Sequence, residues 1–107
     1  MHLPTPVQAY FEQDSAPDGA APLHAFAPDA VVRDEGKLHV GHDAIDAWWR
    51  AAKVKVRSYA EPREVCEQVE GVTVRAVVNG EFPGSPVVLT FDFRLNDAKI
   101  SALEIKA

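Results

Sequence analysis

The sequence has a single cysteine, Cys66, among 107 residues, and it has no long hydrophobic run. One cysteine cannot form an intramolecular disulfide, so we expect a reducing, cytoplasmic location in which Cys66 is a buried and inert thiol. No segment approaches the roughly 20 apolar residues of a membrane-spanning helix, and the first residues lack the charged and apolar blocks of a signal peptide. The sequence therefore predicts no membrane partner.

An excess of positive charge is also missing, because 16 acidic residues outweigh 11 basic ones and give a formal net charge of -5. Binding to nucleic acid requires a cluster of basic side chains, so we expect no nucleic-acid partner. The nearest basic run is KVKVR at residues 53–57. Its lysines alternate with valine, which predicts the entrance of a strand with solvated lysines.

Motifs for common cofactor chemistry are absent as well. The sequence contains no glycine-rich phosphate loop, no G-x-S-x-G elbow and no C-x-x-C pair, so it gives no support to nucleotide cofactors or to serine or thiol catalysis. His39 and His42 have the spacing of a metal-binding pair, but they lie in a loop and no third ligand is evident. We expect neither a cofactor nor a metal.

A helix pattern is present near the N-terminus, over residues 3–13. Thr5 and Gln8 fit a capping box, in which the two side chains satisfy free backbone N–H groups of the first turn. Val7, Tyr10 and Phe11 then follow at the spacing of one buried helix face.

Two further segments predict helices. The shorter one covers residues 19–27 and ends before Pro28, because proline disfavours helical backbone in the residue that precedes it. The clearer one covers residues 40–52, with apolar residues at helical spacing. Trp48 and Trp49 lie about 100° apart around this helix, so we expect one in the core and the other facing a pocket.

The remaining segments have the two-residue period of strands. They are residues 29–36, 59–69, 71–82, 86–95 and 99–106. Three helices followed by a mainly antiparallel sheet predict an α+β fold in a single domain over residues 1–107. A twisted sheet with one apolar face can curl around the helices and leave a pocket lined from both sides.

The order and spacing of these elements resemble the nuclear transport factor 2-like superfamily, and within it the SnoaL-like branch. The stretches that match are VQAYF, FAPDAVVRDEG, GHDAIDAWW, FPGSPVVLTFDFRLND and KISALEI. The resemblance implies a cone-shaped α+β barrel with a deep apolar cavity, and a homodimer formed through the sheet. The superfamily includes isomerases, polyketide cyclases and members without chemistry, so the fold does not define the function.

The ketosteroid isomerases of this superfamily give a sharper comparison. By resemblance, Asp34 stands at the position of their general base and Tyr10 at that of the hydroxyl that binds the oxyanion. A carboxylate can abstract a proton next to a carbonyl, and a hydroxyl can stabilise the oxygen on which charge develops. The sequence departs from the pattern at Phe91, where the isomerases have a second donor, and at Trp49, where they have a supporting tyrosine.

The predicted pocket has an apolar wall in addition to this pair. We expect it to include Phe26, Val32, Trp48, Trp49, Phe82, Phe91 and Phe93. Plain core packing is the alternative for each of these residues. Asp34 has the alternative of a solvated strand end, and Tyr10 that of a core aromatic residue.

Two classes of function follow from these residues. The first is a cavity protein that binds a small, mostly apolar molecule, such as a cyclic ketone or a polyketide-like metabolite. Any chemistry there is proton transfer by Asp34 with Tyr10 as its partner, and it needs no cofactor. The second class is a binding module without chemistry, or a dimerisation or accessory domain.

Overall fold

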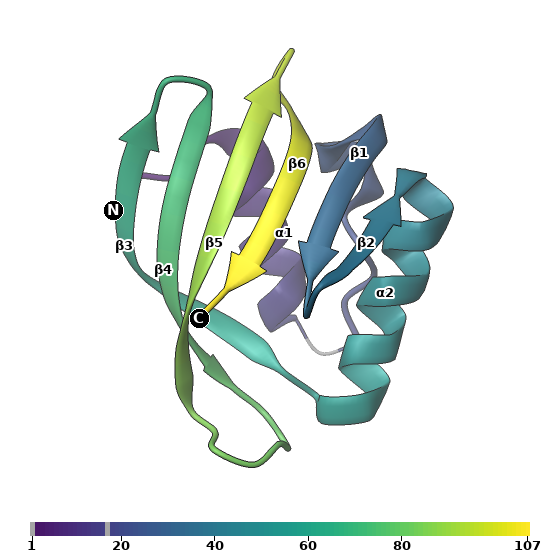
Figure 1. The fold of residues 1–107 in the computed structure, drawn as a ribbon, viewed down its shortest axis with the longest axis vertical. Coiled ribbons are helices and arrows are strands. Elements are labelled where there is room, and N and C mark those ends of the chain that lie inside the picture. The colour runs from purple at the N-terminus through teal and green to yellow at the C-terminus, as the bar shows by residue number, and fades with distance from the viewer. Residues whose placement is uncertain (1, 17) are drawn as a thin grey trace.

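The computed structural model describes residues 2–16 and 18–107 as two α-helices, one short 3-10 helix and a six-stranded sheet (Figure 1). In chain order the elements are α1 (Thr5–Ser15), η1 (Leu23–Ala25), β1 (Phe26–Asp34), β2 (Lys37–Val40), α2 (Gly41–Val56), β3 (Tyr59–Gln68), β4 (Gly71–Asn79), β5 (Val87–Asn96) and β6 (Lys99–Lys106). The predicted α+β class is confirmed.

The six strands form one sheet in the order β2-β1-β6-β5-β4-β3. The pair β1–β6 is parallel and every other neighbouring pair is antiparallel, so the sheet is mainly antiparallel, as predicted. Helix α1 lies behind the strands in Figure 1, and α2 lies beside β1 and β2. The apolar faces of both helices and of the strands join in one buried core.

The prediction of three N-terminal helices is wrong, because the segment expected as the second helix contains only the three-residue turn η1. Pro22 has a ψ of 68°, which is not helical. Phe26 already belongs to β1, where it pairs with Ile100 of β6. Too few residues therefore remain between Pro22 and the sheet for an α-helix, whose nucleation is costly in short segments.

Helix α1 has the predicted buried face but not the predicted cap. Val7, Tyr10 and Phe11 are buried. Thr5 is the first helical residue, with Pro4 before it, and no side chain caps the helix N-terminus. Gln8 instead donates a hydrogen bond to Glu12, one turn further along the helix. Packing of the apolar face, rather than capping, thus stabilises α1.

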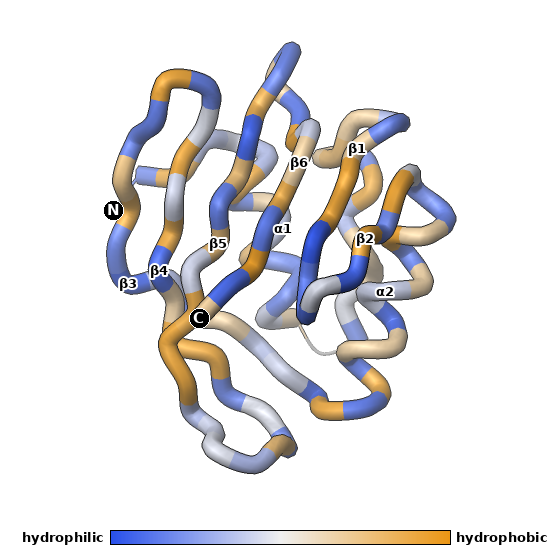
Figure 2. The backbone as a smooth tube through the Cα atoms, in the orientation of Figure 1, coloured by the Kyte–Doolittle hydropathy of each residue, from blue (hydrophilic) through white to orange (hydrophobic). Residues whose placement is uncertain are grey.

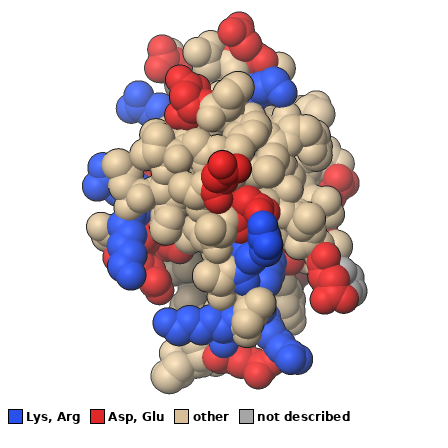
Figure 3. Space-filling model, turned by 90° about the vertical axis from the view of Figure 1, so that its right-hand side faces the viewer, with Lys and Arg blue, Asp and Glu red and all other residues tan. Residues whose placement is uncertain are grey.

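Helix α2 is longer than predicted, because it includes most of the basic run that was expected to begin a strand. It ends at Val56, and Arg57 follows in the left-handed conformation with a φ of 48°. Lys53 and Lys55 lie in its last turn, where positive charge is favourable next to the helix dipole. Figure 3 shows the side of the molecule that is on the right in Figure 1, where α2 lies, and basic side chains gather in the lower part of this view. No helix among the described residues is long and apolar enough to cross a membrane.

The hairpin of β1 and β2 was not predicted, since the sequence indicated only one strand there. Glu35 and Gly36 both have positive φ, 52° and 75°, which is the geometry of a tight two-residue hairpin turn. The turn brings His39 opposite Val32. It also places Asp34 at the end of β1, directly before the turn.

The four later strands lie close to their predicted ranges. Along β4 the residues Val72, Val74, Ala76 and Val78 are buried, as the two-residue period predicts. Figure 2 shows this alternation of hydrophobic and hydrophilic residues along the strands. Phe82 does not extend β4, but lies in the loop that connects it to β5.

The prediction of a buried thiol is wrong, because Cys66 is exposed. It lies on β3, the edge strand of the sheet, opposite Thr73 of β4. Its neighbour Val65 is half-buried, whereas Cys66 falls on the other side of the strand, which faces solvent.

Candidate functional site

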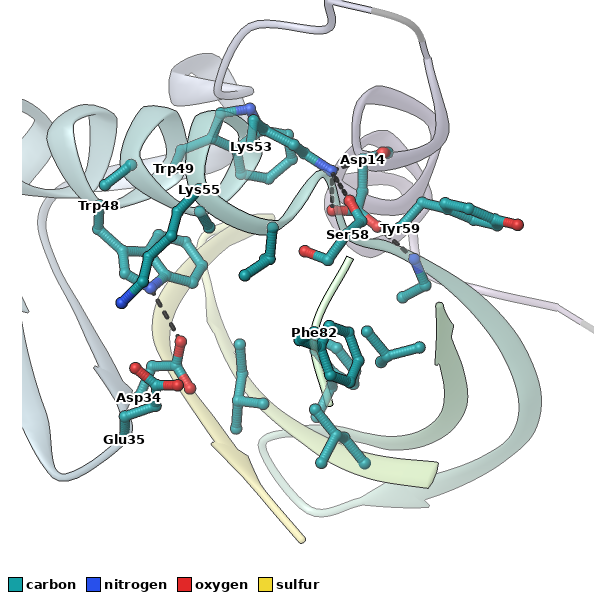
Figure 4. Close-up of a pocket in the computed structure, with 18 of the residues that line it drawn as sticks. Asp14, Asp34, Glu35, Trp48, Trp49, Lys53, Lys55, Ser58, Tyr59 and Phe82 are labelled. Carbon is teal, nitrogen blue, oxygen red and sulfur yellow. Dashed lines mark hydrogen bonds and ion pairs between the residues drawn. The ribbon is translucent and has the colours of Figure 1, made fainter. Parts of the chain in front are cut away.

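A cavity of about 730 Å³ lies between the C-terminal half of α2 and the sheet. Its wall is mostly apolar, with Val78, Phe82, Val87, Leu89, Phe91 and Ile105 among the lining residues. Charged side chains, among them Glu35, Lys37, Lys55 and Lys106, line it as well. Polar groups lie on two opposite sides of it (Figure 4). Asp34 and Trp48 form one side, and Asp14, Lys53 and Ser58 form the other.

Asp34 faces the cavity because it continues the inward-facing positions of β1. Ala30 and Val32, four and two residues earlier, are fully buried on the same side. The indole Nε1 of Trp48 donates a hydrogen bond of 3.0 Å to Asp34 Oδ2. Burial raises the pKa of the Asp34 carboxyl above its usual value, although the bond from Trp48 opposes this effect. Asp34 is therefore an oriented carboxylate at the edge of an apolar space.

Tyr10 also lines the cavity, and its ring is enclosed by other aromatic rings. The rings of Phe11, Phe26, Trp49, Phe91 and Phe93 lie 5.1 to 6.3 Å from it, centroid to centroid. Its hydroxyl makes no hydrogen bond with the described residues. Every fully buried side-chain nitrogen or oxygen atom among these residues has a hydrogen-bond partner, so the Tyr10 hydroxyl is not fully buried. The hydroxyl is thus open to the cavity.

Burial raises the pKa of Tyr10 well above 10.0, and the negative charges of Asp14 and Asp34 raise it further. Tyr10 therefore stays a neutral phenol around pH 7, able to donate a hydrogen bond into the cavity. The two residues that the sequence singled out for chemistry both line the same space.

Four of the predicted wall residues line this cavity, namely Trp48, Trp49, Phe82 and Phe91. The other three, Phe26, Val32 and Phe93, do not belong to its lining. Their side chains are at most 1% exposed, and they fill the core where the helices cover the sheet. Alternation identified the buried face of β5 that carries Phe93, but not the depth at which that residue lies, and Phe26 was expected in a helix rather than in β1.

The two tryptophans of α2 both line the cavity, although only one of them was expected to do so, and they differ in burial. Trp49 is 3% exposed and donates a hydrogen bond of 2.9 Å from Nε1 to the carbonyl of Gly19. Trp48 is half-buried and faces Asp34. The ring of His39 lies 6.0 Å from that of Trp48, so β2 contributes to the same side of the cavity.

The two histidines with metal-pair spacing lie in different environments. His42 lies 3.0 Å from the carbonyl of Phe26 through Nε2, whereas His39 lies beside Trp48. Within residues 2–16 and 18–107, no group of three His, Cys, Asp or Glu side chains is placed to hold a metal ion.

The opposite side of the cavity holds an ion pair that sequence reasoning missed. Lys53 Nζ lies 2.6 Å from Asp14 Oδ1, and the two side chains are 23% and 12% exposed. Burial raises the pKa of Asp14, although the hydrogen bond and charge of Lys53 lower it. The pair joins residues 39 positions apart, for which the sequence carries no signal. The one available hint was that Asp14 lies one helical turn after Tyr10, on the same face of α1.

Comparison with known proteins places this geometry in a family. No family model matches the sequence, and no curated protein matches it either. A crystal structure from Sinorhizobium meliloti, of a protein provisionally named a polyketide cyclase, is 49% identical with a TM-score of 0.92. The match covers 97% of this chain and 95% of that one. The chain belongs to the SnoaL-like, ketosteroid isomerase-related family.

Two less similar structures share the fold of this SnoaL-like chain. A protein from Catenulispora acidiphila with a ketosteroid isomerase-like fold, in complex with trimethylamine, is 18% identical over 99% of this chain and 87% of that one, with a TM-score of 0.85. A computationally designed 17-OHP binder is 21% identical over 100% of this chain and 92% of its own, with a TM-score of 0.79.

One position of the SnoaL-like cavity differs from the isomerase pattern in a way that matters for chemistry. Phe91, at the position expected for a second oxyanion donor, forms part of the cavity wall. Its ring stacks on that of Phe93, with centroids 6.4 Å apart and planes 15° apart. A phenyl ring donates no hydrogen bond, so Phe91 offers only apolar contact.

Proposed function

We propose that this SnoaL-like protein binds a small, mostly apolar metabolite that carries a ketone, and that Asp34 transfers a proton on it. The carboxylate takes a proton from the carbon next to the carbonyl, which breaks a C–H bond and forms an O–H bond on Asp34. The hydroxyl of Tyr10 donates a hydrogen bond to the resulting enolate oxygen. Returning the proton to another carbon completes an isomerase-type step without a cofactor. In a cyclase-type step the enolate carbon instead forms a C–C bond with a second carbonyl carbon of the same ligand, and Asp34 returns its proton to the oxygen of that carbonyl as the C=O π bond breaks.

The observation that carries this proposal is the environment of Asp34. The carboxylate is half-buried beside an apolar cavity, oriented by Trp48, and its pKa is raised by burial. A raised pKa makes a carboxylate a stronger base, which favours proton abstraction from carbon. Tyr10 lines the same cavity with a hydroxyl that has no partner among the described residues.

Binding without turnover is the second candidate, and Phe91 favours it. A missing oxyanion donor typically costs about 3 kcal/mol of transition-state stabilisation. The small molecules named for two proteins of this fold, trimethylamine and 17-OHP, support binding as the more general role.

Replacement of Asp34 by asparagine separates the two candidates, because it keeps the shape and removes the base. We expect the wild-type protein to exchange deuterium into the carbon next to the carbonyl of cyclic ketones in D₂O, as followed by NMR. The Asp34→Asn variant should exchange at least about 100-fold more slowly, with a ketone Kd changed less than about 3-fold. Asp29→Asn, on the exposed part of β1, is the matched control.

Three results are informative here. Full exchange by Asp34→Asn shows that another group is the base. Binding by both proteins without exchange by either supports the non-catalytic role. No binding of any ketone by the wild type contradicts the proposed ligand class.

We also propose a homodimer formed through the outer face of the sheet. Val77 and Val88 pair directly across β4 and β5 on this face, and Val88 is 50% exposed. Burial of such valines against a second copy is favourable. A monomer in analytical ultracentrifugation at micromolar concentration contradicts this part of the proposal.

A further inference from the structure

The side of the cavity opposite Asp34 presents a different kind of polar surface. It is built where the ends of α1 and α2 meet the start of β3, from Asp14, Lys53 and Ser58. In Figure 4 these three residues lie together across the cavity from Asp34. A ligand that fills the cavity therefore meets both sides.

The charges on this side are satisfied by the protein itself. Lys53 Nζ donates to Asp14 Oδ1 at 2.6 Å, to the Asp14 carbonyl at 2.7 Å and to the Ser58 carbonyl at 2.7 Å. These three bonds use all three hydrogens of the ammonium group. Asp14 Oδ2 accepts a further bond of 2.6 Å from the backbone N–H of Ala60. Neither ion is left with an unmet charge that would select a charged ligand.

The hydroxyl of Ser58 is the polar group that remains for a ligand. The side chain is half-buried, lines the cavity and points into it (Figure 4). It makes no hydrogen bond with any residue that the structure describes, although its own carbonyl is held by Lys53. The Lys53–Asp14 pair thus holds the backbone of Ser58 in place and leaves its hydroxyl free.

We propose that Ser58 binds a neutral oxygen at the end of the ligand that lies farthest from its ketone. The ligand class is then a small apolar ketone with a second oxygen, a hydroxyl or a carbonyl, at the opposite end of the molecule. A carboxylate or an ammonium group is disfavoured there, because it would lose hydration and meet only a compensated ion pair. This inference rests on the proposed function, which places the ketone at Asp34.

The test compares pairs of ketones that differ by one hydroxyl group. Fused-ring ketones of two, three and four rings, each with and without a hydroxyl on the ring farthest from the ketone, are titrated by calorimetry. For at least one ring number the hydroxyl should lower the wild-type Kd about 2- to 10-fold, as one net hydrogen bond allows. In Ser58→Ala this gain should disappear, while the Kd of the ketone without the hydroxyl stays unchanged.

Two controls keep this test decisive. Ser58→Ala should fold normally, because Lys53 bonds to the carbonyl of Ser58 and not to its side chain. Ser15→Ala, on the exposed end of α1, should keep the gain. If the ketones bind but no pair shows a gain, or if the gain survives in Ser58→Ala, the Ser58 subsite is wrong and the proposed function stands. If no ketone binds, both are overturned.

Discussion

Two carboxylates, Asp14 and Asp34, line opposite sides of one cavity, and burial raises the pKa of both. Asp14 bonds to a lysine and to a backbone N–H group. Asp34 receives one side-chain bond, from the neutral indole of Trp48. The comparison teaches that partners, not burial, distinguish a structural carboxylate from one that can act on a ligand. Four substitutions, two of them paired with a comparison variant, test this distinction.

The largest effect should come from Asp14→Ala. It leaves the ammonium of Lys53 in a mostly buried place without its counter-ion, which typically costs about 3 kcal/mol of unfolding free energy. Asp34→Ala is the comparison, and we expect a loss below about 1 kcal/mol, because removing an incompletely paired carboxylate also removes its desolvation cost. Urea unfolding at neutral pH measures both. Equal losses would show that the two carboxylates play the same structural role.

Lys53→Met should lower the unfolding free energy by about 2 kcal/mol at neutral pH, because Asp14 then stays buried without its lysine. The variant should recover part of this loss in acid. Without Lys53 the pKa of Asp14 rises further, and a carboxyl whose pKa is higher in the folded than in the unfolded state binds a proton on folding.

The proton that Asp14 binds on folding thus stabilises the Lys53→Met variant at low pH. This stabilisation is lost as the pH rises through the pKa that Asp14 has in the folded state. Unfolding at a series of pH values checks this expectation. A deficit that is independent of pH would mean that Lys53 acts through packing alone.

Trp48→Phe should act on the chemistry more than on the fold. The indole bond lowers the pKa of Asp34, so its loss moves the acidic limb of the kcat/KM profile to higher pH. We also expect kcat to fall about 10-fold, because the base loses the donor that orients it. Deuterium exchange of a cyclic ketone across the pH range measures both. Trp49→Phe, which breaks the bond to Gly19, should leave the limb in place.

The smallest effect should come from Arg50→Ala. Arg50 and Asp46 form an ion pair one helical turn apart on α2, and the Arg50 side chain is 74% exposed. Exposed pairs of this kind contribute little, because water screens them and both side chains lose entropy. We expect no measurable change in Tm. A decrease in Tm as large as the one that Lys53→Met causes would show that the exposed ion pair stabilises the fold as much as the buried one.

Much of the fold was predictable, because its signals are local. The two-residue period of β4 and β5 identified their buried faces, and the helical spacing of Val7, Tyr10 and Phe11 identified the buried face of α1. Asp34 was singled out by the family resemblance, whereas the local pattern alone left a solvated strand end as its alternative. A period assigns a residue to a face, and each of these assignments needs only neighbours along the chain.

The failures involve contacts between distant segments. Residues 19–27 were expected as a helix, but pairing of Phe26 with Ile100 draws the end of this segment into the sheet. The run at residues 53–57 has a two-residue alternation, yet α2 continues to Val56 and Lys53 reaches Asp14. Such long-range contacts override weak local preferences in short segments.

Residue pattern and order along the chain predicted the α+β class, the inner faces of the strands and the buried helix face that carries Tyr10, and the family resemblance pointed to Asp34. Contacts between distant segments establish that Asp14 is neutralised by Lys53 and that Asp34 faces the cavity without a charged partner. Asp14 and Lys53 are 39 residues apart, whereas Asp34 meets an indole 14 residues away. Periodicity describes one element at a time, and the pairing of charges depends on where separate elements meet in space.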